Sequence, residues 1–190
     1  MKAFTGYEPK YQAAGGGNFE PLPPAAYVGR IYGAKADDQA LTLQLDVTEG
    51  EFAQYYHKRF EADKDSPYGQ KYKGMLRLNL PNGGQYDDIN IRIFNGAIGA
   101  IELSNPGYKW DWNEAGLKGK AIGFCVRERE FVTRDNTVGV MNEIFMLVSE
   151  EDARNGKIKT PKRKNLKNRP AEASCSNGGY MEVDVEDVPF

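Results

Sequence analysis

The alternation of apolar and polar residues predicts five β-strands. In the clearest, residues 40–47, apolar side chains fall on one face and polar ones on the other; the apolar set is Leu41, Leu43, Leu45 and Val47. The other strands are expected at 27–36, 73–80, 120–131 and 138–148. Gly29 and Gly33 in the first strand indicate a bulge or a sharp bend, which small barrels need in order to close.

Two segments have the apolar spacing of a helix instead. Between the second and third strands, residues 49–62 repeat an aromatic side chain every three or four positions, as Phe52, Tyr55, Tyr56 and Phe60. Residues 87–103 show a similar spacing through Ile91, Phe94, Ile98 and Ile101. Five strands with a helix between the third and fourth is the order of an OB-fold. The sequence therefore predicts a mainly β protein in which residues 27–150 form a closed five-stranded OB-fold barrel.

The segments on either side of this domain lack such patterns. Residues 1–26 contain a run of three glycines and the sequence Pro21-Leu22-Pro23-Pro24, which predict an irregular lead-in. Residues 151–181 are polar and too poor in apolar side chains to fold alone, so we expect a flexible basic linker. Residues 182–190 then form an acidic tip.

The net charge of −2 hides an uneven distribution. Residues 157–169 hold seven basic side chains and no acidic one, whereas residues 182–187 hold four acidic side chains and no basic one. Without these blocks and Glu172, residues 1–155 carry 18 basic and 22 acidic side chains. A nucleic-acid site in the body would therefore have to come from a local grouping of cations.

The residues of most catalytic and metal chemistry are scarce. One histidine, His57, and two cysteines, Cys125 and Cys175, supply neither a zinc ligand set nor a marked nucleophile–base pair. Phosphate-binding loops, the dinucleotide fingerprint and the nucleophile elbow are absent. We therefore expect no enzymatic activity, no metal and no cofactor. No run of about 20 apolar residues and no signal-peptide pattern occur, which predicts a cytoplasmic protein, or a nuclear one if the host has a nucleus.

The acidic tip resembles the C-terminal tip of bacterial single-stranded DNA-binding proteins. The matching residues are Asp184, Glu186, Asp187, Val188, Pro189 and Phe190. Val183 and Val185 depart from the pattern because they interrupt the acidic run. The terminal Phe offers a ring and a carboxylate to a basic, apolar pocket, and the acids steer the tip toward a basic surface. The resemblance implies that the tip recruits replication, recombination and repair proteins; the plainer alternative is an acidic solubilising tail.

The body resembles a family of phage-encoded proteins over roughly positions 20–155. The resemblance rests on Pro23 to Arg30, on Thr48 to Phe52 followed by Tyr55-Tyr56, and on Leu117 to Lys120 leading into Gly123 to Glu128. Members of that family occur in phage recombination and replication modules and are suspected to bind single-stranded DNA. The resemblance implies a phage origin, the host bacterial cytoplasm as location, and an OB-type body.

Proteins that bind single strands place Lys and Arg along the phosphates and aromatic rings against the bases. The candidate contacts of this kind are Arg30, Tyr32, Tyr55, Lys58, Arg59, Lys71, Tyr72, Lys73, Arg77, Arg127, Arg129 and Arg134. Arg77 alternates with inward leucines and should face outward, and Arg127 and Arg129 share a strand face. Tyr32 fits the barrel core as well as the surface.

Helical spacing divides the aromatic segment 49–62 into two faces. Phe52, Tyr56 and Phe60 are expected to pack on the barrel, while Tyr55, Lys58 and Arg59 face outward. Trp110 and Trp112 are expected to be core or loop anchors rather than platforms for bases. His57 is expected to be an ordinary surface histidine.

Three functions remain open at this point. The first is a protein that binds single-stranded DNA with little sequence preference. The second is an adaptor whose body binds protein, and the third is an annealing protein or recombination mediator. The sequence does not decide whether the protein is a homo-oligomer. The opposite charges of 157–169 and the tip also raise the hypothesis that they bind each other until DNA displaces the tip.

Overall fold

The computed structural model describes residues 20–64 and 70–167, so the acidic tip, including Asp184 to Phe190, lies outside the described residues. The elements are β1 (Ala26–Ala36), β2 (Ala40–Val47), α1 (Tyr55–Ala62), β3 (Met75–Asn79), α2 (Asp87–Ser104), the 3₁₀ helix η1 (Glu114–Leu117), β4 (Ala121–Val132), β5 (Val138–Val148) and α3 (Glu150–Arg154). All five predicted strands are present, with ends within two residues of those expected. No helix in the described ranges is long and apolar enough to cross a lipid bilayer.

The five strands form one antiparallel sheet in the order β3-β2-β1-β4-β5. The predicted closed barrel is wrong: in the described chain no ladder joins β3 to β5, and the sheet stays open. The two edges nevertheless approach each other. Leu22 lies in this gap, because its backbone N–H donates to the Tyr55 hydroxyl of α1 and its carbonyl accepts from the Asn142 amide of β5.

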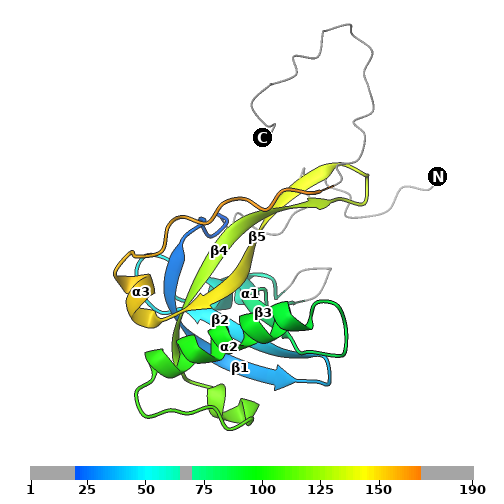
Figure 1. Ribbon diagram of the computed structural model, residues 1–190. Coiled ribbons are helices and arrows are strands. Elements are labelled where there is room, and N and C mark those ends of the chain that lie inside the picture. Colours follow the sequence, from blue (N-terminus) through cyan, green and yellow to red (C-terminus); the bar gives the residue numbers. More distant parts are fainter. Residues whose placement is uncertain (1–19, 65–69, 168–190) are drawn as a thin grey trace, which may run out of the picture.

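One face of the sheet carries the hydrophobic core. Leu41, Leu43 and Leu45 of β2 are at most 2% exposed, which confirms the alternation predicted for this strand. Ile31, Ile122 and Phe124 extend the core across β1 and β4. Helix α2 lies across this part of the sheet (Figure 1). It contributes its own buried side chains, which are Phe94, Ala97, Ile98, Ala100 and Ile101.

The predicted irregularity of the first strand is a β-bulge. The register of β1 against β2 shifts between Ile31 and Gly33, so Tyr32 has no direct partner. Gly29 is needed for close packing, because a Cβ there would lie 2.4 Å from the Asp46 carbonyl oxygen and 2.5 Å from the Phe124 ring. The bulge resets the alternation of the strand, and Tyr32 points away from the core.

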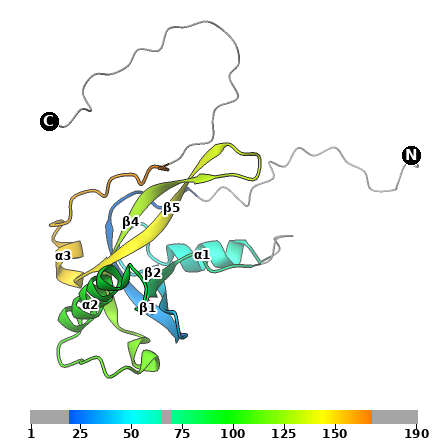
Figure 2. The same cartoon turned by 45° about the vertical axis from the view of Figure 1, so that its right-hand side comes forward.

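Strands β4 and β5 extend beyond the other strands as a hairpin arm, residues 126–144 (Figures 1 and 2). The described part of the predicted linker runs beside this arm. The Lys164 N–H donates to the Glu128 carbonyl at 2.9 Å, and the Glu130 N–H donates to the Lys164 carbonyl at 2.9 Å. The Arg163 guanidinium also pairs with the Glu128 carboxylate. Basic side chains of this segment are therefore held along β4 by backbone pairing.

Candidate nucleic-acid interface

The solvent side of β1, β2 and β3 brings together residues from three strands. Across the ladders, Thr42 of β2 lies opposite both Lys35 and Arg77, and Gln44 lies opposite both Gly33 and Met75. Side chains of directly opposite residues share a face and lie about 5 Å apart at Cβ. We call this surface the outer face and define it by Arg30, Tyr32, Lys35, Gln44, Met75 and Arg77.

The outer face is exposed and carries more positive than negative charge. Tyr32 is 46% exposed, so the alternative that placed it in the barrel core is wrong. Arg30 and Lys35 are exposed and have no ion-pair partner among the residues described. Arg77 lies 3.8 Å from Asp37, whose pKa is lowered mainly because its carboxylate accepts the backbone N–H groups of Gln39 and Ala40.

Asp46 is the one acid that the ladder places beside Arg30. Its side chain is buried, at 1% exposed, although the alternation of β2 predicted an outward position. The carboxylate accepts the backbone N–H groups of Tyr56 at 2.9 Å and His57 at 2.8 Å, in the first turn of α1. Asp46 therefore caps the helix and leaves the Arg30 charge available to solvent or a ligand.

The segment before β3 is partly anchored. Tyr72 is half-buried, its hydroxyl donates to the Leu45 carbonyl at 2.9 Å, and its ring contacts Tyr56 and Phe60. Burial first, and then the charge of Asp46, raise the pKa of Tyr72. Lys71 is exposed, and Lys73 lies 3.9 Å from Asp63. This segment offers cations beside the outer face, while Tyr72 braces it.

The expectation that Tyr55 faces outward is wrong, because its side chain is only 6% exposed. Its hydroxyl donates to the Glu20 carbonyl and accepts the Leu22 N–H. The predicted packing on the core is present for Phe52 and Tyr56, whereas Phe60 is half-buried against the Tyr72 ring. Lys58 is exposed as expected. Arg59 is half-buried and lines, with Lys73, a cleft of about 270 Å³ between α1 and β5. Helix α1 thus contributes the cations Lys58 and Arg59, but the Tyr55 ring is not accessible to a ligand.

The arginines of the hairpin arm are paired with an acid. Arg127 and Arg129 share a face as predicted, and the Glu143 carboxylate lies 2.7 Å from Arg127 and 3.3 Å from Arg129. The Arg127 guanidinium also covers the Phe145 ring at 4.3 Å. Arg134 is exposed near the end of the arm and has no ion-pair partner within the described chain. Glu143 therefore offsets much of the positive charge predicted here.

Some exposed groups near these surfaces were not singled out from the sequence. Lys35, Gln44 and Met75 join the outer face only because of the register between strands, which a single strand pattern does not reveal. Trp112 is 76% exposed, although an anchoring role was expected. Its ring stacks on Phe94 with centroids 6.0 Å apart. The neighbouring Trp110 is half-buried against the core, as an anchor would be.

No protein-family model matches this chain, and a search of curated proteins finds no significant match. The interface is therefore defined by the residues and their geometry alone.

Proposed function

We propose that the protein binds single-stranded DNA across the outer face, with little sequence preference. The observation that carries the proposal is that Arg30, Lys35 and Arg77 share an exposed face with the Tyr32 ring, while Asp46 is buried against helix α1. Cations that follow phosphates and a ring that stacks on a base are the two elements of single-strand binding. The strand order and the helix between β3 and β4 support an open variant of the OB-fold, which binds oligonucleotides on a comparable face.

Tyr32 gives the sharpest test of this proposal. Stacking of one base on an aromatic side chain contributes about 1–3 kcal/mol, so Tyr32→Ala should weaken binding of a labelled oligothymidine by about 5- to 150-fold. Tyr32→Phe keeps the ring and should bind nearly as the parent protein does. Fluorescence anisotropy at fixed salt measures both. Equal affinity for duplex and single strands, or no binding of either, would overturn the proposal.

A second part of the proposal concerns the acidic segment 184–190, which lies outside the described residues. Because this segment resembles the C-terminal tips of bacterial single-stranded DNA-binding proteins, we propose that it recruits replication, recombination or repair proteins of a phage module or its host. Removal of residues 182–190 should abolish capture of such partners and leave a folded body. Unchanged capture by the shortened protein would rule out this part alone.

An adaptor that binds protein instead of DNA is the alternative, and the hairpin arm favours it. Strand β5 is an edge of the sheet, and its exposed apolar side chains include Val138, Val140 and Met141, each at least 40% exposed. Exposed edges can accept a further strand from a partner. Absence of oligonucleotide binding together with capture of a protein that is lost on Val140→Lys would favour the adaptor.

A further inference from the structure

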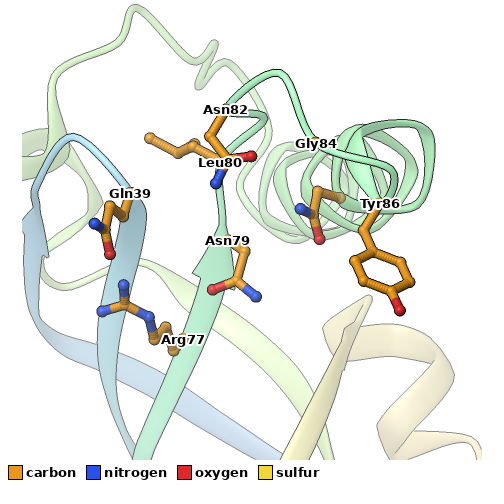
Figure 3. Close-up of a pocket in the computed structure, with 8 residues that line it drawn as sticks. Gln39, Arg77, Asn79, Leu80, Asn82, Gly84 and Tyr86 are labelled. Carbon is orange, nitrogen blue, oxygen red and sulfur yellow. The ribbon is translucent and has the colours of Figure 1, made fainter.

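A pocket of about 350 Å³ lies at one end of the outer face, where the end of β3 meets the turn before β2 and the start of α2 (Figure 3). Six of its lining residues carry its chemistry: Gln39, Arg77, Asn79, Asn82, Tyr86 and Asn90. Figure 3 shows Gln39, Arg77 and Asn79 on the strand side and Tyr86 on the helix side. Arg77 belongs to both the pocket and the outer face, so the two surfaces are continuous.

The amide groups of this pocket have unused hydrogen-bonding capacity. In the described structure, the side-chain amides of the four lining Asn and Gln residues make no hydrogen bond within the chain. Three amides elsewhere are used: Asn105 donates to two carbonyls, Asn113 caps η1, and Asn142 donates to Leu22. Four unpaired amides around one hollow provide donors and acceptors together, and no carboxylate lines it.

The pocket is held in shape by backbone hydrogen bonds. The Asp87 carboxylate at the start of α2 accepts the N–H groups of Asn82 at 3.0 Å and Gly83 at 2.8 Å, and these bonds lower the pKa of Asp87. The Leu80 N–H donates to the Gln39 carbonyl at 2.7 Å. Gly83 has a φ of +86°, which favours glycine at this turn. The backbone that carries the lining side chains is therefore arranged before any ligand arrives, which reduces the entropy lost on binding.

We propose that this pocket receives one unstacked nucleobase of the strand bound on the outer face. A base edge presents donors and acceptors side by side, which mixed amides can match and a purely cationic site cannot. The Tyr86 ring is 61% exposed and supplies a stacking surface. Arg77 holds the adjoining phosphate at the mouth. The pocket volume lies at the lower end of the range for small-ligand sites. The inference rests on the proposed single-strand binding.

Photo-crosslinking separates this inference from the proposal on which it rests. An oligonucleotide that carries 5-iododeoxyuridine in place of thymidine is irradiated with the full chain, and crosslinked peptides are mapped by mass spectrometry. Crosslinks at both Tyr32 and Tyr86 are expected. Crosslinks at Tyr32 without Tyr86 would overturn the pocket and leave the outer face standing. Failure of the parent protein to bind any single strand would overturn both.

Variants of the pocket amides supply the second measurement. The double change Asn79→Ala with Asn90→Ala should reduce the Tyr86 crosslink at least fivefold and leave the Tyr32 crosslink unchanged. Asn95 belongs to α2, as Asn90 does, but lies outside the pocket. Asn95→Ala therefore removes an exposed amide of this helix and serves as the matched control. Tyr86→Ala should lower oligothymidine affinity by about tenfold, and Tyr86→Phe should restore it. Equal crosslinking of Tyr86 in the double variant and the parent would overturn base recognition by the amides.

Discussion

The outer face and the hairpin arm each place an arginine directly opposite an acid on the neighbouring strand, yet the two pairs differ. On the arm, Arg127 lies opposite Glu143 and forms an ion pair of 2.7 Å. On the outer face, Arg30 lies opposite Asp46, but Asp46 is turned to the first turn of α1. The same cross-strand pattern therefore gives a neutralised arginine in one region and an available one in the other.

The difference comes from the elements packed beside each pair. Backbone N–H groups at the start of a helix are unsatisfied and attract a carboxylate, and α1 presents two of them to Asp46. Among the described residues no helix N–H donates to Glu143, and its carboxylate binds the guanidinium groups of Arg127 and Arg129. The start of α1 thus binds the acid that would otherwise pair with Arg30. A protein whose body is slightly acidic can in this way present a free arginine to a polyanion without any change in net charge.

The largest expected effect follows from removing the acid that α1 captures. Asp46→Ala leaves the buried N–H groups of Val47 and Tyr56 and the partly buried N–H of His57 without their acceptor, and we expect a loss of about 3 kcal/mol in the free energy of unfolding. Asp46→Asn keeps one acceptor oxygen and should lose less. Urea denaturation measures both. A loss below about 1 kcal/mol in the alanine variant would show that Asp46 does not hold α1 on the sheet.

The second prediction compares the two arginines in their contribution to salt dependence. If the outer face contacts phosphates, Arg30→Ala should make the slope of log affinity against log salt less negative by about 0.7, the value for one phosphate contact on a single strand. Arg127→Ala should change it by less, because Glu143 already balances this charge. Arg92, an exposed arginine of α2, is the control position.

Glu143→Gln tests the same comparison by removing the acid of the hairpin arm instead of an arginine. The change releases Arg127 and Arg129 from their ion pairs, and the slope should become more negative if the arm lies along the strand. A larger effect from Arg127→Ala than from Arg30→Ala would reverse the roles that the structure gives to the two regions.

Local patterns predicted much of the fold and less of the site. The alternation in 40–47 and the glycines of the first strand correctly indicated a half-buried strand and a bulge, since both depend on neighbours in sequence. Whether the sheet closes depends on pairing between β3 and β5, and the contacts of Leu22 with Tyr55 and Asn142 join residues 33 and 120 positions apart. The inward turn of Tyr55 and the capture of Asp46 also depend on distant partners. A single-sequence pattern does not contain that information.

The pocket at the end of β3 is the feature that the sequence pattern was least able to predict. Its amides come from the turn before β2, from β3, from the loop after it and from α2, and each one alone is an ordinary polar surface residue in the sequence. Only the meeting of these elements reveals that four amides share one hollow. The linker is a related case, because its basic side chains were recognised but its pairing with β4 was not.

The smallest expected effect appears at alkaline pH and concerns the buried and half-buried tyrosines Tyr27, Tyr56 and Tyr72. Burial, and then the Glu51 charge, raise the pKa of Tyr27 from 10.0 to about 12, and its hydroxyl donates to the Pro23 carbonyl at 2.8 Å. The unfolded chain therefore ionises this group first, and the stability it contributes is present below pH 10 and lost as the pH rises toward 12. Tyr56 and Tyr72 shift in the same direction. Tyr27→Phe should therefore reduce, but not abolish, the fall in the urea midpoint between pH 10 and 12. If the midpoints of variant and parent fall in parallel, folding does not raise the pKa of Tyr27.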